Sequence, residues 1–403
     1  MHYRKPCKLH YRIAQAVCWV VSKLIFRNKV LRNEIKGVSG PFVVIANHQC
    51  AYDFVNLIGA TSRPMSFVIS NSFYNSLPIR GFLNKMGVIP KQQFQTTVMD
   101  MKNMKAVIDN GQPLVIYPAG LMCEDGLSTP IPGATYKFLK WLGVDVYVAR
   151  SYGSYFVMPK WSKGMRPGKT SIDIYKLFDK EDLAQMSVDA IRQTTCDALL
   201  FDAYREQERN PQRYRHGSSV EGLQNVLYRC PHCGQEFTIA ASDSQTLTCT
   251  ACGYSQHSDE FGFLHNDGQG PELRYVSDWS RQIFDDLKDR LRHDPDFAIT
   301  AETEIHALCA DKPKFGPAGQ GTLTVRADGI SLTGVLHGEP LEVCLPVGAI
   351  PTLPFSPGRY LELQHGSNIY RCVLDDSKLV MKCINMVKIF YELHAEELTE
   401  APT

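Results

Sequence analysis

The stretch Pro41–Phe54, PFVVIANHQCAYDF, indicates how the first part of the chain folds. It begins with the apolar run Phe42–Ile45, in which three residues are β-branched, as is typical of a buried strand. Asn47 and His48 follow this strand, and a helix-like run begins at Asp53. Because open α/β sheets place their ligands at the carboxyl ends of strands, we expect His48 to lie at such a site.

The spacing of His48 and Asp53 predicts a general base. Asp53 lies about one helical turn beyond His48, so its carboxylate can reach back to Nδ1 and leave Nε2 free to accept a proton from a hydroxyl. In a chain with twelve histidines, a His-x4-Asp spacing is expected by chance about once. The spacing alone therefore does not establish a general base, and this interpretation depends on the preceding strand and on the later motifs.

Composition and charge limit the class of protein. The chain has 403 residues, 44% of them hydrophobic and 21% charged, which is typical of a globular protein of two or three domains. The formal net charge of +1 argues against a polyanion-binding protein as a whole. The first 36 residues, however, carry many Lys and Arg opposed only by Glu34, which indicates an anionic partner, either a membrane or a nucleic acid.

Hydropathy and cysteine content suggest the compartment. The thirteen cysteines include four in a tight set and nine without a framework spacing, which favours reduced thiols in the cytosol. The sequence has no run that approaches the roughly 18 apolar residues of a spanning helix. The apolar run Ile13–Phe26 is short, is interrupted by Lys23 and lacks a cleavage site, so we do not expect a signal peptide.

Residues 11–28 have apolar side chains at helical spacing, together with Trp19 and flanking Lys and Arg. A basic amphipathic helix of this kind can lie in a membrane interface. The same pattern fits a helix packed on its own domain, and both interpretations stay open.

Apolar strand-like and helix-like runs alternate as far as about Lys176. The strand-like runs are 42–46, 66–70, 87–90, 114–117, 144–149 and 171–175, and the helix-like runs are 53–60, 73–83, 96–109 and 135–142. Pro78 is expected to interrupt the run 73–83. The alternation predicts an α/β layer with a largely parallel or mixed sheet and flanking helices. One long helix over Lys180–Gln207 and a polar linker over Arg209–Ser219 follow.

A zinc ribbon is predicted by two Cys-x-x-Cys pairs. Cys230 and Cys233 are separated by fifteen residues from Cys249 and Cys252, and each pair is followed by Gly. Four thiolates complete a tetrahedral structural site for Zn²⁺ without an open position for catalysis. Such ribbons also bind nucleic acids, but the intervening segment is neither basic nor rich in aromatic residues, so a nucleic-acid partner is not expected. His232 is interpreted as a bystander.

From residue 321 onward the pattern changes to period two. A hairpin with a turn at Asp328-Gly329 precedes further strands, and a helix over Ser377–Leu393 ends the pattern. Several antiparallel strands capped by one helix resemble a pleckstrin-homology or GRAM-like barrel, which implies lipid or protein docking. A charged helix around Trp279–Leu291 occupies the preceding linker.

Four blocks resemble the glycerolipid acyltransferases, the lysophosphatidate acyltransferase superfamily. Asn47–Asp53 resembles its NH-x4-D block, and residues 77–81 with 87–90 are similar to its second block. Ile116–Gly120, IYPAG, resembles the third block, Phe-Pro-Glu-Gly, and residues 144–153 occupy the place of the fourth. The resemblance covers about residues 10–175.

The resemblance also identifies candidate site residues and two departures. It implies that His48 and Asp53 are catalytic, and that substrate contacts come from Asn47, Lys91, Tyr117, Pro118, Gly120 and Arg150. The Arg that usually ends the second block and meets the acceptor phosphate is replaced by Gln93, and the Glu of the third block is replaced by Ala119. The usual Pro of the fourth block is replaced by Val148.

The implied function is the transfer of a fatty acyl group from acyl-CoA or acyl carrier protein to the free hydroxyl of a lysophospholipid such as 1-acyl-glycerol-3-phosphate. The expected enzyme contains a structural Zn²⁺ and no redox cofactor, and binds peripherally or monotopically to the cytoplasmic face of an anionic membrane. The alternative is a weakly active or inactive acyltransferase-fold scaffold that binds lipid at the membrane surface.

The expected domain order follows from these assignments. Residues 1–36 form the membrane-associating helical segment, 37–228 the acyltransferase domain and 229–256 the zinc ribbon. Residues 257–315 form a helical linker, and 316–396 form the mainly β, barrel-like C-terminal domain closed by a helix.

Overall fold

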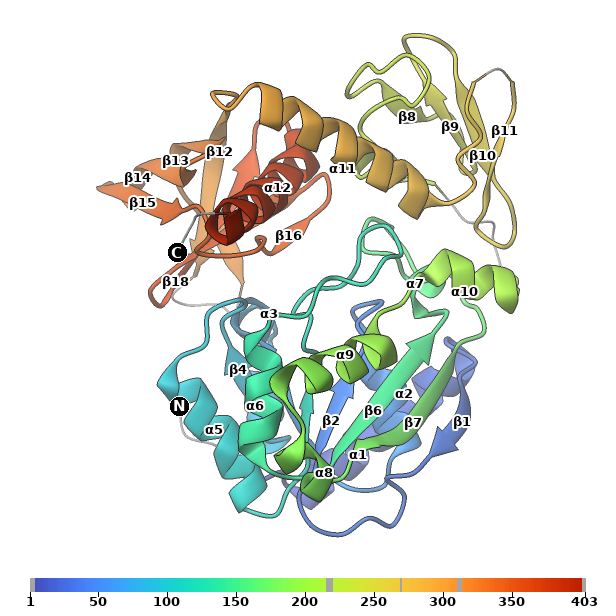
Figure 1. The fold of residues 1–403 in the computed structure, drawn as a ribbon, viewed down its shortest axis with the longest axis vertical. Helices are drawn as coiled ribbons and strands as arrows, with labels where there is room; N and C mark the ends of the chain where they lie inside the picture. Colours follow the sequence, from blue (N-terminus) through green and yellow to red (C-terminus); the bar gives the residue numbers. More distant parts are fainter. Residues whose placement is uncertain (1–3, 215–219, 269, 310–313, 401–403) are drawn as a thin grey trace. The chain divides into compact units, whose positions relative to one another are not determined.

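The structure is a computed structural model that describes residues 4–214, 220–268, 270–309 and 314–400 (Figure 1). Its chain divides into two compact units. Unit 1 contains the described residues of Met1–Lys160, Gly164–Ser218 and Glu260–Gly262, and unit 2 contains those of Trp161–Lys163, Ser219–Asp259 and Phe263–Thr403. The predicted linker Arg209–Ser219 lies partly outside the described residues.

Unit 1 is built on a seven-stranded sheet with the order β1-β7-β6-β2-β5-β3-β4. Its strands are β1 (Lys29–Asn33), β2 (Val43–Ala46), β3 (Ser66–Ser70), β4 (Ile89–Lys91), β5 (Leu114–Ile116), β6 (Val146–Tyr152) and β7 (Ser171–Phe178). Neighbouring strands run parallel except β6 and β7, which run antiparallel. The prediction of a largely parallel or mixed sheet is therefore confirmed.

Strand β1 lies within residues 1–36, which were expected to form a basic helical segment. Its residues Lys29–Asn33 are mostly exposed and pair with one neighbour, β7, at the sheet edge. Charged residues are typical of edge strands, where they oppose pairing with other chains. The basic composition did not indicate a strand, because β1 is stabilised by pairing with a partner about 140 residues later in the sequence.

Helices cover the sheet of unit 1. They are α1 (Lys8–Leu24), α2 (Asp53–Ala60), α3 (Asn71–Ser76), α4 (Arg80–Lys85), α5 (Val98–Asp109), α6 (Ala134–Leu142), α7 (Ser154–Val157), α8 (Lys180–Gln185), α9 (Val188–Leu199) and α10 (Ala203–Arg209). The predicted break at Pro78 is present between α3 and α4.

The single long helix predicted over Lys180–Gln207 is wrong, because this segment contains α8, α9 and the start of α10. Ser187 caps α9 by accepting a hydrogen bond from the backbone N–H of Ala190. Asp202 similarly caps α10. These side chains satisfy N–H groups at new helix starts, which favours three short helices over one continuous helix.

The sheet core surrounds β2. All four residues of this strand are buried, with Val43, Val44 and Ile45 at 0% exposure. Complete burial of one such side chain contributes about 1.5–3 kcal/mol. Since β2 is paired on both sides, by β5 and β6, the segment that follows it begins from a rigid position in the sheet.

Unit 2 begins with a small antiparallel sheet of order β11-β10-β9-β8. Its strands are β8 (Ile239–Ala241), β9 (Thr246–Cys249), β10 (Ser255–Ser258) and β11 (Leu264–Asn266). The 3-10 helix η1 (Leu223–Asn225) precedes them in the chain. The sheet therefore extends beyond residue 256, where the ribbon was expected to end. Helix α11 (Val276–His293) follows it.

The second sheet of unit 2 has seven antiparallel strands in the order β15-β14-β13-β12-β18-β17-β16. They are β12 (Ile299–Leu308), β13 (Phe315–Arg326), β14 (Gly329–Leu336), β15 (Glu339–Pro346), β16 (Phe355–Ser356), β17 (Tyr360–His365) and β18 (Asn368–Leu374). Helix α12 (Leu379–Glu400) packs against β13, β14, β16 and β17. This arrangement confirms a mainly antiparallel C-terminal region with a final helix.

Strand β12 corrects the expectation of a helical linker over residues 257–315. It pairs with both β13 and β18, and it buries Ile299, Thr303 and Ile305.

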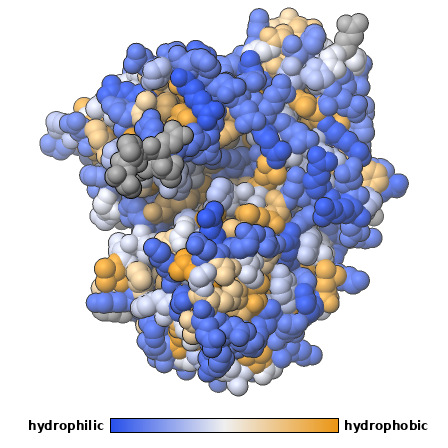
Figure 2. All heavy atoms as spheres, viewed as in Figure 1, coloured by the Kyte–Doolittle hydropathy of each residue, from blue (hydrophilic) through white to orange (hydrophobic). Residues whose placement is uncertain are grey.

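The face of each unit that is in view shows apolar residues interspersed among hydrophilic ones (Figure 2), as is normal for folded domains.

Candidate active site and cysteine cluster

His48 and Asp53 meet at the carboxyl end of β2, as the sequence predicted. The His48 Nδ1 atom lies 3.0 Å from Asp53 Oδ2. The His48 side chain is 23% exposed, whereas that of Asp53 is 1% exposed. A carboxylate at Nδ1 favours the tautomer in which Nδ1 carries the proton and Nε2 presents its lone pair. The arrangement can therefore accept a proton from a ligand hydroxyl.

Asp53 is held by the backbone that follows His48. Its Oδ2 accepts hydrogen bonds from the backbone N–H groups of Gln49 at 2.7 Å and Cys50 at 2.9 Å. Its Oδ1 accepts a hydrogen bond from the Cys50 thiol at 3.5 Å. Asp53 is also the first residue of α2, where a negative charge is favoured by the helix dipole. The carboxylate is thus fixed before a substrate binds.

The Cys50 thiol is not suited to act as a nucleophile. The side chain is completely buried, and burial, assisted by the charge of Asp53, raises the pKa of Cys50 well above its ordinary value. A thiol of this kind stays protonated at neutral pH. The complete burial of Cys50 therefore indicates a packing role.

Tyr117, from the segment after β5, lies beside the candidate base. Its ring centroid is 4.6 Å from that of His48. Burial, followed by the charge of Asp53, raises the pKa of Tyr117 well above its ordinary value. The next residues form a turn in which Gly120 has a φ of +73° and donates its N–H to the Tyr117 carbonyl at 3.0 Å. Pro118 and Ala119 are the central residues of this turn.

Two groups that the resemblance suggested as substrate contacts already have partners within the protein. The N–H of Gly120 closes the turn described above. The Lys91 ammonium donates to the carbonyls of Gln92 at 2.9 Å and Gln95 at 3.0 Å, and burial lowers its pKa. Lys91 therefore fastens the loop that follows β4.

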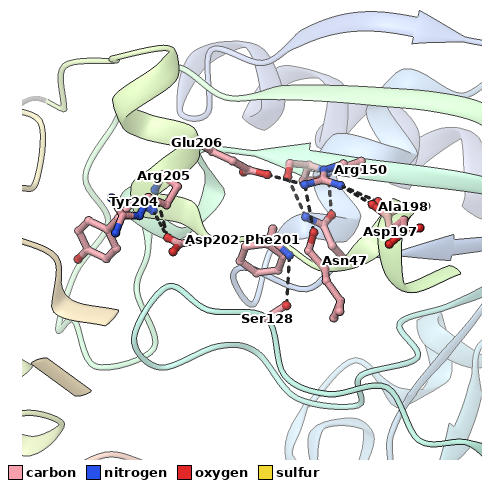
Figure 3. A network of polar contacts seen from close by, with 12 residues as sticks. Asn47, Ser128, Arg150, Asp197, Ala198, Phe201, Asp202, Tyr204, Arg205 and Glu206 are labelled. Atoms are coloured by element: carbon pink, nitrogen blue, oxygen red, sulfur yellow. Dashed lines mark hydrogen bonds and ion pairs between the residues drawn. The ribbon is translucent and has the colours of Figure 1, made fainter. Parts of the chain in front are cut away.

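Asn47 and Arg150 connect elements of unit 1 (Figure 3). The Asn47 side chain makes two hydrogen bonds, 2.9 and 2.8 Å long, to the backbone of Ser151 on β6. Arg150 donates to the Ala198 carbonyl at 2.8 Å and pairs with Glu206 at 2.6 Å. These contacts give both residues a structural role, since their polar groups are used to connect β2, β6 and the helices α9 and α10.

Sequence reasoning missed two contacts that shape the site. Cys123 donates its N–H to the His48 carbonyl at 3.4 Å, and its thiol lies 3.8 Å from the Gln49 carbonyl. Gln93 donates from Nε2 to the Gly120 carbonyl at 2.6 Å. Each contact joins segments that are at least 27 residues apart, so no local pattern could have indicated it.

The four predicted cysteine ligands come together in unit 2. Their Sγ atoms all lie within 4.8 Å of one another, and two pairs, Cys230–Cys252 and Cys233–Cys249, are separated by 3.8 Å. A tetrahedral Zn²⁺ site with Zn–S bonds of about 2.3 Å has S–S edges of about 3.8 Å. The donor set and its geometry therefore fit a zinc ion.

The backbone positions these cysteines through two similar turns. Gly234 donates its N–H to the Cys230 carbonyl at 3.0 Å, and Gly253 donates to the Cys249 carbonyl at 2.9 Å. Both glycines have positive φ, +74° and +76°, which other residues adopt with difficulty. His232 stacks against Tyr254 and does not belong to the four-thiol set.

Helix α1 both packs on its own domain and exposes an apolar face. Its buried side is anchored by Ser22, whose hydroxyl donates to Asn56 on α2 at 2.9 Å. The apolar side chains that stay largely exposed are Leu9, Ile13, Val17, Trp19, Val20 and Leu24. Exposed Lys8, Arg12 and Lys23 accompany them. Among the described helices, none has the length and apolar character needed to cross a bilayer.

Comparisons with known proteins relate the first unit to acyltransferases. The family model described as Acyltransferase matches residues 25–157, roughly a third of the chain. A solved structure, the 1-acyl-sn-glycerophosphate (LPA) acyltransferase PlsC from Thermotoga maritima, is 15% identical with a TM-score of 0.41, and the match covers 51% of this chain and 79% of that chain. No curated protein sequence matches. The segment with acyltransferase-family similarity contains His48, Asp53 and Tyr117.

Proposed function

We propose that unit 1 is an O-acyltransferase that moves a fatty acyl group from acyl-CoA or acyl carrier protein to the free hydroxyl of a lysophospholipid-type acceptor, with 1-acyl-glycerol-3-phosphate as the reference compound. The observation that carries this proposal is the buried Asp53 carboxylate on Nδ1 of a partly exposed His48, within the segment that matches the acyltransferase family.

In the proposed reaction, Nε2 of His48 accepts the acceptor's hydroxyl proton while the oxygen attacks the thioester carbonyl. The tetrahedral intermediate collapses with loss of the thiolate, which takes the proton from the imidazolium and leaves as the thiol. Asp53 orients the ring and stabilises its positive charge during the transfer. General-base catalysis of this kind typically accelerates a reaction by about 10²–10⁴-fold. A covalent enzyme intermediate is not needed, because the thioester is already activated.

The proposed enzyme works peripherally at the cytoplasmic face of an anionic membrane. The exposed apolar face of α1 and its Lys and Arg side chains support this placement, because such helices lie in the lipid interface with their cations near anionic head groups. The acceptor and the product are both lipids, so a site held at this surface meets them where they concentrate.

Unit 2 has proposed structural and docking roles. The four thiols would hold Zn²⁺ as a closed site that stabilises the small sheet. The seven-stranded sheet with α12 supports the resemblance to a pleckstrin-homology or GRAM-like domain, for which we propose a lipid or protein docking role. Fold similarity alone does not identify a ligand.

The second candidate function is a lipid-binding scaffold with weak or absent activity. It is favoured by Gln93 and Ala119 at positions where the resembled family uses charged side chains, and by the backbone contacts that occupy Lys91. The presence of both His48 and Asp53 in hydrogen-bonded geometry favours the enzyme.

The deciding experiment measures thiol release from acyl-CoA and acyl carrier protein donors with a panel of lysolipid acceptors, using wild type and His48→Ala. Release by wild type that is lost in His48→Ala, with an unchanged unfolding curve, supports the enzyme. Equal release by both proteins would exclude His48 as the base. Absence of release from a folded wild type that binds vesicles would favour the scaffold.

A further inference from the structure

The loops that follow β4 and β5 form one connected wall beside the candidate base. Gln93 Nε2 donates to the Gly120 carbonyl at 2.6 Å. The ring of Phe94, a residue with a positive φ of +60°, lies 3.6 Å from the position that a Cβ atom on Gly120 would occupy. Tyr117, which begins the second loop, lies against His48. An acceptor whose hydroxyl reaches His48 therefore lies close to this wall.

The hydrogen-bond donors of this wall are largely used within the protein. The backbone N–H of Gly120 donates to the Tyr117 carbonyl, and one N–H of the Gln93 side-chain amide donates to the Gly120 carbonyl. The partly buried Lys91 ammonium donates to the Gln92 and Gln95 carbonyls. The carboxamide oxygen of Gln93 is a hydrogen-bond acceptor, and the methyl group of Ala119 is apolar.

A phosphate monoester needs the opposite chemistry. It carries a charge of about −1.5 to −2 at pH 7, and its oxygens accept hydrogen bonds. Proteins usually neutralise such a group with Arg side chains, whose planar fork donates to two oxygens at once. A wall with a neutral carboxamide and an engaged ammonium offers weak compensation for the lost hydration of a phosphate. A hydroxyl, in contrast, can donate to a carboxamide oxygen.

We infer that the group next to the reacting hydroxyl of the acceptor is an uncharged hydroxyl and not a phosphate monoester, so that the acceptor is a monoacylglycerol-like lipid. This inference rests on the proposed acyl transfer to the hydroxyl of a lysolipid, and it replaces the phosphate-bearing acceptor of that proposal with a neutral one. Gln93 is the specificity-determining residue, because its side-chain amide binds the Gly120 turn and is neutral at the position where the resembled acyltransferases have Arg.

The test compares thiol release with 1-acylglycerol and with 1-acylglycerol-3-phosphate of the same acyl chain, each presented in the same neutral detergent micelles. The proteins are wild type, Gln93→Arg and Gln112→Arg. Gln112 precedes β5, at the opposite end of the strand from the site, so Gln112→Arg adds the same charge elsewhere. We expect wild type to favour 1-acylglycerol in kcat/KM by at least about tenfold.

The variants test the residue assignment. Gln93→Arg should shift the ratio toward the phosphate acceptor by about tenfold or more, while Gln112→Arg keeps the wild-type ratio. A wild-type preference for 1-acylglycerol-3-phosphate overturns the inference alone, even if Gln93→Arg fails to fold. If neither of these two acceptors supports release above the level of His48→Ala but another lysolipid does, the inference alone is overturned. Absence of such release with every lysolipid tested overturns the proposed function together with the inference.

Discussion

Replacing Asp53 by Asn separates the charge of this side chain from its shape. Asp53 Oδ2 accepts hydrogen bonds from His48 Nδ1 and from the backbone N–H groups of Gln49 and Cys50, at 3.0, 2.7 and 2.9 Å. A carboxamide oxygen can accept the same three bonds, but each loses its ionic component. Since hydrogen bonds to charged groups contribute about 1.5–3 kcal/mol and neutral ones about 0.5–1.5, we expect the unfolding free energy to fall by about 2–4 kcal/mol.

The effect on catalysis should be larger than the effect on stability. The imidazolium formed on His48 during proton transfer loses its carboxylate partner, and the 1% exposure of Asp53 means that water screens this interaction little. The equivalent change in a Ser-His-Asp site lowers kcat by about 10⁴-fold. For Asp53→Asn we expect a decrease of about 10³–10⁴-fold in kcat, with the KM for the thioester nearly unchanged.

The assay is thiol release at saturating acceptor, accompanied by urea unfolding to show that the variant is folded. Asp109→Asn is the matched control, because it makes the same chemical change at a 57% exposed side chain on α5. A folded Asp53→Asn protein that keeps more than about a third of the wild-type kcat would refute the reasoning, because the carboxylate would then contribute under 1 kcal/mol to the transition state.

Three further predictions concern other parts of the chain. Cys230→Ser should lower the zinc content measured by atomic absorption and lower the Tm of unit 2, because three thiolates complete the site less well; unchanged zinc and Tm would contradict a structural metal. Arg150→Met should lower the unfolding free energy by about 3 kcal/mol, since it leaves the mostly buried Glu206 carboxylate unpaired, and adding Glu206→Gln should restore part of this loss in urea unfolding. A folded variant with a raised KM and an unchanged unfolding free energy would instead favour a substrate contact for Arg150. The pair Val17→Ser and Trp19→Ser should weaken sedimentation with anionic vesicles by at least about tenfold without changing Tm, because both side chains are more than half exposed. Unchanged vesicle binding would exclude α1 as the lipid contact.

The sequence by itself determined the features that depend on local interactions. The β-branched run of β2 and the start of α2 at Asp53 place a histidine and a carboxylate about one turn apart in the sequence. Pro78 separates α3 from α4 because it cannot continue the hydrogen bonding of a helix. The two Cys-x-x-Cys pairs, each followed by a glycine that adopts positive φ, similarly determine the thiol turns.

Only the tertiary structure decided which polar side chains near the site are available to a ligand. Arg150 was expected to contact the substrate, and the structure shows that it pairs with Glu206, 56 residues later. The sequence showed Gln93 only as a neutral residue in place of the Arg of the resembled family. Its hydrogen bond to the Gly120 carbonyl makes it part of the wall beside His48. Strand β1 likewise depends on β7. Such contacts join segments that are distant in sequence, and their stability comes from burial and pairing that no local pattern encodes.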